Sequence, residues 1–153
     1  MLKFLTIITY IMFISSAELS TQTAKIDFEE FDLANGLHVI LHKDNTNPIV
    51  SVDIWYHVGA KDEDPGRTGF AHLFEHMMFQ GSGNVKKTEH FNYIQNAGGT
   101  LNGTTNQDRT NYFETAPSNQ LELLLWLESD RMSTLQVKKK NFDNQREVVK
   151  EEK

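Results

Sequence analysis

Apolar and polar residues alternate along residues 49–58. The apolar side of this stretch consists of Val50, Val52, Ile54, Tyr56 and Val58. Because successive side chains of a β-strand point to opposite faces, a period of two predicts a long strand with one face buried. Two shorter strand-like stretches, 26–33 and 37–42, flank Asn35-Gly36, a dipeptide that strongly indicates a hairpin turn. The first third of the chain is therefore expected to be built of strands.

The remainder of the chain predicts helices separated by further strands. Helices are expected at residues 69–79, 89–97, 120–132 and 138–153, and strands at 100–105 and 109–115. Thr68 and Thr88 precede the first two helices as N-caps, and Ser118 or Asn119 caps the third. This order of elements predicts an α+β fold, in which an antiparallel sheet is covered by helices on one face.

Composition indicates one soluble globular domain and excludes several classes of function. Of 153 residues, 39% are hydrophobic and 24% are charged, as in ordinary soluble domains. The net charge of −6, without a basic face, argues against a nucleic-acid partner. There is no cysteine, so a disulfide framework and a cysteine-ligated zinc site are both excluded.

The N-terminus has the pattern of a secretory signal peptide. Lys3 precedes an apolar stretch at residues 4–14, and Ser15-Ser16-Ala17 supplies the small residues of a cleavage site. We expect residues 1–17 to be removed, leaving a domain of residues 18–153. The apolar stretch is too short for a stable membrane span, although a retained interfacial anchor is an alternative. The protein is expected to be exported, to the periplasm or the extracellular space.

The expected helix at 69–79 carries the candidate chemistry. His72 and His76 are four residues apart and lie on one helical face, so both imidazoles can bind one metal ion. Glu75 lies about 80° to one side of them, where its carboxylate can act on water as a general base rather than as a ligand. The alternatives are a chance surface pair and core histidines with satisfied hydrogen bonds. Burying three polar groups among Phe, Leu and Met is costly without a metal, which favours a metal site.

A catalytic zinc site commonly has three protein ligands and a water molecule, so one ligand remains to be found. Without cysteine, the missing donor should be a carboxylate or a histidine. Spacing leaves the candidates open: Glu114, Glu122, Glu128, Asp130, Glu147, Glu151 and Glu152.

The motif His72-x-x-Glu75-His76 is similar to that of the pitrilysin-type zinc metallopeptidases, or inverzincins, the family of insulin-degrading enzyme and the mitochondrial processing peptidase. The resemblance also covers Trp55-Tyr-His-Val-Gly-Ala60, Pro65 to Gly81, Gly98-Gly-Thr-Leu-Asn-Gly103, Arg109-Thr-Asn-Tyr-Phe113 and Leu125 to Met132. After the signal segment, the chain resembles the first half of the N-terminal domain of a pitrilysin-like two-domain unit.

The resemblance implies a zinc endopeptidase acting on short or unfolded polypeptides, with one Zn²⁺ held by His72, His76 and Glu152 and with Glu75 as general base. The substrate would be added as a strand along residues 101–105, where Asn102 would contact its backbone. Several family members carry a Glu two helical turns before the third ligand, where this chain has Gln145. An amide does not shuttle protons, so the expected role of Gln145 is limited to orientation.

The resemblance also implies a partner. Full-length family members have a second, related domain that closes over the substrate, so the chain is expected to be a fragment that lacks its C-terminal half or a homologous second domain or subunit. Two other functions remain open. One is a non-catalytic, pitrilysin-like module for assembly or peptide holding, and the other is a periplasmic zinc-binding protein without turnover.

Overall fold

The computed structural model of the protein describes residues 25–152, and these form two compact units that meet between Asn45 and Thr46. The expected signal peptide, residues 1–17, lies outside the described residues. The first unit is a hairpin in which β1 (Glu29–Asp32) pairs antiparallel with β2 (His38–Leu41). Gly36 has a φ of 85° in the connecting turn, which glycine adopts without strain. The hairpin predicted from Asn35-Gly36 is therefore confirmed.

The second unit contains a three-stranded antiparallel sheet. Its strands are β3 (Ile49–Tyr56), β4 (Thr100–Thr105) and β5 (Thr110–Pro117). The order is β3-β5-β4, so β5 is central. Within residues 25–152, the outer edge of β4 has no strand beside it. The strands were expected, but the structure divides them into two sheets rather than one.

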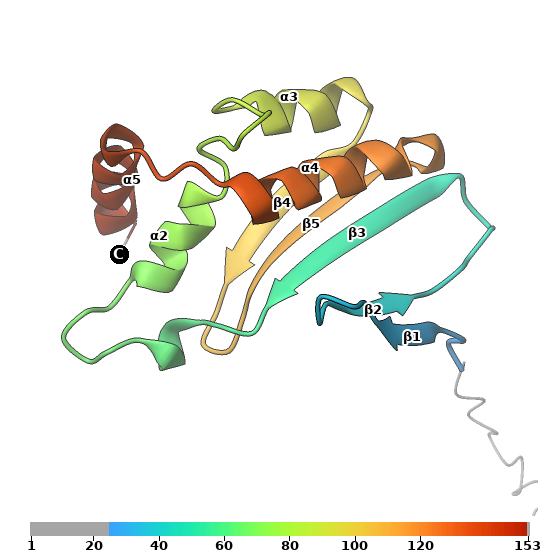
Figure 1. The fold of residues 1–153 in the computed structure, drawn as a ribbon, viewed down its shortest axis with the longest axis horizontal. Helices are drawn as coiled ribbons and strands as arrows, with labels where there is room; N and C mark the ends of the chain where they lie inside the picture. The colour runs from blue at the N-terminus through green and yellow to red at the C-terminus, as the bar shows by residue number, and fades with distance from the viewer. Residues whose placement is uncertain (1–24, 153) are drawn as a thin grey trace, which may run out of the picture. The chain divides into compact units, whose positions relative to one another are not determined.

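Within residues 25–152, four helices accompany this sheet. They are α2 (Phe70–Met77), α3 (Glu89–Asn96), α4 (Leu121–Thr134) and α5 (Lys139–Glu151), with short 3-10 turns η1 (Ala60–Asp62) and η2 (Ser118–Gln120). Helices α2, α3 and α4 contact the sheet, whereas α5 packs against α2 (Figure 1). The α+β class expected from the order of elements is confirmed.

The core lies between one face of the sheet and the helices. One buried cluster consists of Val85, Ile94, Ala116, Leu124 and Leu127, with Val50, Val52 and Leu101 packed against it. On β3 the alternate residues Ser51, Asp53 and Trp55 are exposed. The sheet is therefore covered by helices on one face, as the period of two in residues 49–58 predicts.

The start of α2 differs from the sequence prediction. Thr68 is not the N-cap; that position belongs to Gly69, whose φ is 98°. The carboxylate of Glu63 instead accepts hydrogen bonds from the backbone N–H groups of Gly69 and Ala71, both over 2.7 Å. The negative charge also suits the positive end of the helix dipole. A loop residue several positions away thus replaces the expected threonine cap.

Of the two other expected caps, Thr88 is confirmed in its position and the cap of the third helix differs. Thr88 is the N-cap of α3 but adopts a φ of 71° and its side chain makes no capping hydrogen bond. The third helix begins later than expected because Ser118 and Asn119 form the η2 turn, and Gln120 takes the N-cap position of α4.

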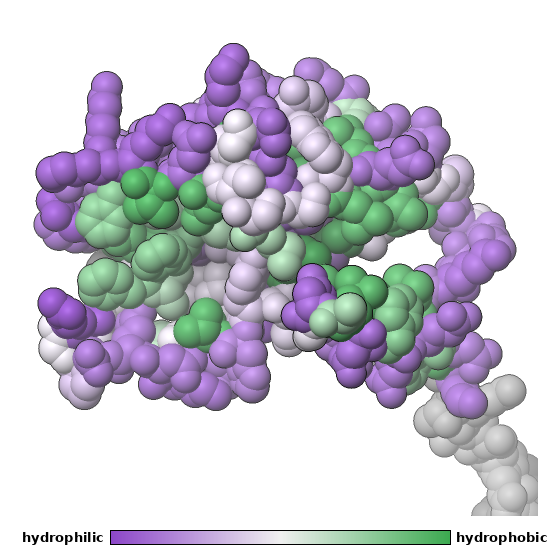
Figure 2. Space-filling view, in the orientation of Figure 1, coloured by the Kyte–Doolittle hydropathy of each residue, from purple (hydrophilic) through white to green (hydrophobic). Residues whose placement is uncertain are grey.

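The surface mixes polar and apolar side chains. Figure 2 shows apolar patches between hydrophilic regions, and large exposed side chains include Phe70 and Phe74 of α2 and Leu125 of α4. Among residues 25–152, none of the helices combines the length and the apolar character needed to cross a bilayer.

Candidate metal centre and active site

The buried apolar face of helix α2 holds the helix in one orientation, which determines where its histidine side chains point. Leu73 and Met77 are buried and form a second core cluster with Val149 of α5, against which Phe142 packs. His72 and His76 directly precede these two anchors in sequence, so they lie on the adjacent stripe of the helix. Their rings meet edge to face with centroids 4.8 Å apart.

Helix α5 brings a carboxylate to the two imidazoles. Glu152, which follows α5, places its Oε2 3.4 Å from His72 Nε2 and 3.5 Å from His76 Nε2. The two Nε2 atoms are 3.2 Å apart. In a tetrahedral zinc site with bonds of about 2.0–2.1 Å, neighbouring donors are separated by roughly 3.3–3.4 Å. The three donor atoms therefore fit one zinc ion.

The donor atoms also remain accessible. The side chains of His72, His76 and Glu152 are 36%, 20% and 46% exposed, which leaves room for a further ligand beside the three. Glu151, the neighbouring acid, is exposed and does not belong to the group of donors.

Gln145 orients one of the imidazoles. Its Oε1 lies 3.0 Å from His76 Nδ1. Since an amide oxygen only accepts, His76 Nδ1 carries the proton, and the neutral ring presents a lone pair at Nε2. That is the nitrogen that faces His72 and Glu152. The position of Gln145, two helical turns before Glu152, predicted a role limited to orientation, and this contact is compatible with that role.

Glu75 lies beside the three donor atoms of His72, His76 and Glu152 but is not one of the donors. Together with His72 it lines a groove of roughly 660 Å³, which is also bordered by Thr104, Thr105 and Asn106. Thr105 Oγ1 donates a hydrogen bond to Glu75 Oε2 over 2.5 Å. The carboxylate is thus half-buried and tied to the sheet while sharing an open space with a candidate metal ligand. Nothing in the spacing of the sequence indicated the contact with Thr105.

A separate, mainly apolar hollow of roughly 510 Å³ lies on the other side of α2. Its lining includes Tyr56, Phe70, Phe74 and Met78. The spacing of 70, 74 and 78 identifies another face of the helix, and neither His72 nor Glu75 lines it. This hollow is therefore not the site of the candidate chemistry.

Asn102 lies on the edge strand β4 with its side chain exposed. Its Oδ1 accepts a hydrogen bond from the backbone N–H of Gly103 over 2.9 Å. The side-chain amide nitrogen carries two further donors, so this residue is available to an added strand.

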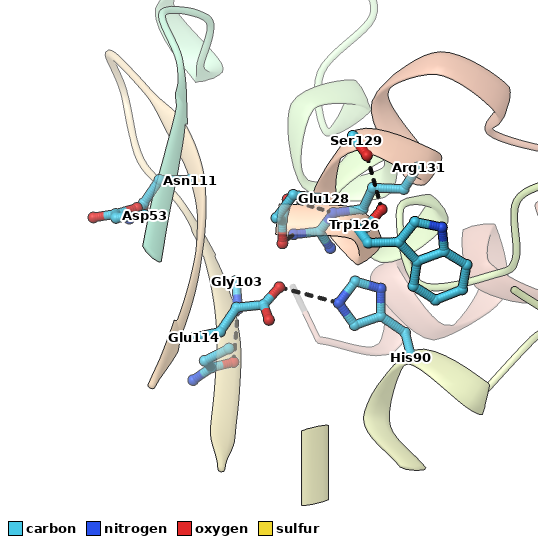
Figure 3. Close-up of polar contacts among 10 residues, drawn as sticks. Asp53, His90, Gly103, Asn111, Glu114, Trp126, Glu128, Ser129 and Arg131 are labelled. Carbon is cyan, nitrogen blue, oxygen red and sulfur yellow. Dashed lines mark hydrogen bonds and ion pairs between the residues drawn. The ribbon is translucent and has the colours of Figure 1, made fainter. Parts of the chain in front are cut away.

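Two of the acids considered as ligands lie elsewhere, in a second group of candidate donors that includes His90, Glu114 and Glu128. Figure 3 shows these side chains with Arg131 between α3, α4 and β5. His90 Nε2 lies 3.1 Å from Glu114 Oε1, and all four residues are buried. Glu114 and Glu128 are thus not available to the site on α2.

Burial shifts the pKa values of two residues in this group, Glu128 and His90. Burial raises the pKa of Glu128 to about 8, helped by the neighbouring carboxyl of Glu114 and opposed by Arg131. Burial also lowers the pKa of His90 to about 4, and Arg131 adds to this by repulsion. The interior therefore favours the neutral form of both side chains.

One member of this second group, Glu128, already binds a cation of the protein. Arg131 Nε donates to Glu128 Oε2 over 2.9 Å and Nη2 donates to Oε1. The guanidinium also lies over the rings of Tyr112 and Phe79, 4.2 and 5.2 Å from their centroids. A metal ion would have to displace it, so the group fits a core polar network rather than a second metal site.

Comparison with known proteins decides the family. The family model described as Insulinase (Peptidase family M16) matches residues 38–153. The chain belongs to the insulinase family. The resemblance stated from the sequence is confirmed, and the match includes every residue of the candidate centre.

Relatives within the insulinase family include named zinc proteases. The chain is 33% identical over 137 residues to the "Zinc protease PqqE" of Helicobacter pylori, covering 89% of this chain and 31% of the relative. It is 30% identical over 99 residues to the human insulin-degrading enzyme, covering 64% of this chain and 10% of that enzyme. The chain therefore spans less than a third of the length of either relative.

Solved structures agree on the fold. A protease from Helicobacter pylori matches with a TM-score of 0.81 and 34% identity, covering 84% of this chain and 31% of that one. Pitrilysin matches with a TM-score of 0.75 over 86% of this chain and 14% of its own; at 23% identity this supports the fold alone. The pitrilysin-like fold class is thus confirmed.

Proposed function

We propose that this insulinase-family chain is the metal-binding part of a zinc endopeptidase that hydrolyses peptide bonds in short or unfolded polypeptides. The observation that carries the proposal is the triangle of His72 Nε2, His76 Nε2 and Glu152 Oε2, with sides of 3.2, 3.4 and 3.5 Å. These side chains would hold one Zn²⁺ ion. When bound, zinc supplies a Lewis acid that polarises a carbonyl and makes water acidic near neutral pH.

Glu75 acts as general base in this proposal. It shares the groove with His72 but stands outside the triangle, so its carboxylate is free to accept a proton from water and later to give it to the leaving amine. The hydrogen bond from Thr105 to Oε2 leaves the other oxygen for that exchange. His76 contributes through Nε2 because its Nδ1–H donates a hydrogen bond to Gln145 Oε1.

The substrate lies as an added strand along β4. This strand pairs with β5 on one side, and its other edge has no strand beside it within residues 25–152. Backbone hydrogen bonds along such an edge bind a peptide with little demand on its sequence. Asn102, exposed on β4, contacts the substrate backbone through its free amide donors. This mode of binding suits short or unfolded polypeptides.

The proposal extends to the whole protein. A second, related domain, in the same or another chain, closes over the substrate and supplies further binding groups. The protein is exported after removal of residues 1–17, with residues 18–153 belonging to the catalytic domain. N-terminal sequencing of the mature protein tests the cleavage, which should leave Glu18 as the first residue.

The central test combines metal analysis with peptide cleavage. Zinc-loaded protein that includes the second domain should cleave a quenched unstructured peptide, and a chelator should stop it. Glu75→Gln should keep full zinc content and lose about 10²- to 10⁴-fold in kcat, whereas His76→Ala should lose the zinc. A Glu75→Gln protein that cleaves at the original rate would refute the role of Glu75. Zinc binding without cleavage would favour a zinc-binding protein without turnover, and no zinc binding would favour a non-catalytic module.

A further inference from the structure

Glu75 is attached to the sheet at its carboxylate. Since an ionised carboxylate only accepts, the 2.5 Å hydrogen bond between Thr105 Oγ1 and Glu75 Oε2 is donated by the threonine. Thr105 is the last residue of β4, so the bond joins the metal-binding helix to the edge strand. Among residues 25–152, no hydrogen bond reaches Glu75 Oε1.

The direction of the Thr105 hydroxyl is set from the neighbouring strand. Thr105 is paired with Thr110 of β5, and their Oγ1 atoms are 3.3 Å apart. Thr110 is buried and donates its single hydroxyl proton to the backbone carbonyl of Val58 over 3.1 Å. Thr110 thus presents only oxygen lone pairs to Thr105, and the Thr105 proton is directed to Glu75.

The absence of a side chain at Gly103 is a second, independent observation about the stem of Glu75. A Cβ placed on Gly103 would lie 3.2 Å from Glu75 Cγ and 3.2 Å from Tyr112 Cδ1. Both distances are shorter than ordinary van der Waals contact between carbon atoms. The glycine therefore leaves the space in which the Glu75 side chain lies against β4, with its head group at Thr105.

We propose that Thr105 is a positioning residue for Glu75. Its hydroxyl fixes one carboxylate oxygen, so that the other is held at a constant place in the groove beside His72. This inference rests on the proposed function, in which Glu75 moves protons during peptide hydrolysis. Displacing such a group by about 1 Å can lower a rate about 100-fold, so losing the hydroxyl affects turnover more than binding.

Three variants of zinc-loaded protein test the role in catalysis. Thr105→Val keeps the shape but removes the hydroxyl, and should lower kcat about 10- to 100-fold with KM and zinc content unchanged. Thr105→Ser keeps the hydroxyl and should recover most of the rate. The matched control is Thr115→Val, which removes a hydroxyl that lies 2.8 Å from Ser51 Oγ on the other face of the sheet, and should leave kcat unchanged.

A wild-type kcat in Thr105→Val would overturn the proposal. Equal losses in Thr105→Val and Thr105→Ser would also overturn it, because they would indicate packing rather than the hydrogen bond.

A second measurement does not depend on activity. In metal-free protein, Thr105→Val, Glu75→Ala and the double variant form a cycle of unfolding midpoints. The proposal expects the double variant to shift the midpoint by less than the sum of the single shifts, because the shared bond is lost only once. Additive shifts would overturn it. If the zinc-loaded wild type cleaves no peptide, the proposed function fails, while this cycle still decides whether Thr105 holds Glu75.

Discussion

The side-chain oxygen of Gln145 lies 3.0 Å from Nδ1 of His76 and accepts a hydrogen bond from its N–H. The two residues come from different helices, α5 and α2, which pack together through Phe142, Val149 and Met77. The contact fixes both the tautomer and the rotation of the imidazole. Outer partners of this kind raise the metal affinity of a ligand that they orient.

Loss of this contact should weaken zinc binding. Gln145→Ala is expected to lower zinc affinity about 10- to 100-fold, measured by competition with a chelator. Gln145→Glu keeps an acceptor at the same place and should retain the affinity. Asn144→Ala, a change of the exposed neighbouring amide, serves as control. Equal affinities for Gln145→Ala and Asn144→Ala would show that the hydrogen bond does not orient a ligand.

The choice between the adjacent acids Glu151 and Glu152 is directly testable. Only Glu152 lies within 3.4–3.5 Å of the two imidazole nitrogens. Glu152→Gln should therefore reduce zinc affinity by more than the roughly 10- to 100-fold expected from loss of an outer partner, whereas Glu151→Gln should have no effect. Isothermal titration with zinc measures both. The reverse ranking would exclude Glu152 as third ligand.

The buried network predicts a pH dependence of the free energy of unfolding. The folded state raises the pKa of Glu128 from 4.5 to about 8. The protonated side chain therefore stabilises the folded state, and this stabilisation is lost as pH rises through that range. The folded state lowers the pKa of His90 from 6.5 to about 4, so its contribution is lost as pH falls through that range. The two oppose each other between pH 4.5 and 6.5.

Above pH 6.5, Glu128 is the one of these two residues that still changes the free energy of unfolding. That free energy should fall by about 2 kcal/mol between pH 6.5 and 8. Urea denaturation at these two pH values measures the fall. Glu128→Gln should remove this dependence, because an amide does not titrate and its oxygen can still accept a hydrogen bond from Arg131. A Glu128→Gln protein with the same pH dependence as wild type would contradict the assignment.

The loop before α2 should not accept a side chain at Gly59. A Cβ there would lie 2.4 Å from the backbone oxygen of Asn106 and 2.6 Å from the backbone of Gln107. Gly59→Ala is therefore expected to lower the free energy of unfolding by about 1–3 kcal/mol. Gly66→Ala, in the same loop, meets nothing within 4 Å and is the matched control. Equal unfolding midpoints for the two variants would count against this packing.

The regular elements were predictable because their periodicity is local. The alternation in residues 49–58 and the Asn35-Gly36 turn state directly which residues form strands. The first residues of helices were harder to predict from sequence. Glu63 caps α2 from the preceding loop, and only folding brings its carboxylate to the N-terminus of that helix.

The candidate site could be derived from the sequence only in part. Spacing alone identified His72, Glu75 and His76, because one helical turn brings them together. The third donor could not be chosen from spacing, because seven acids lie far from His72 and His76 in the sequence and helix geometry relates none of them to the pair. Only the family resemblance favoured Glu152. For Glu114 and Glu128 the sequence did not reveal that Arg131 and His90 surround them. The i, i+3 spacing of Glu128 and Arg131 is the signal that could have indicated a buried pair.

The donor triangle also has a mechanical consequence for the end of the described chain. Two donors belong to α2, and the third follows the last residue of α5. An ion held by all three would act as a clasp that opposes fraying of α5, and its binding free energy would be shared with the docking of that helix. Amide hydrogens in the final turns of α5 should then exchange with solvent more slowly when zinc is present, so that metal occupancy and the order of this helix change together.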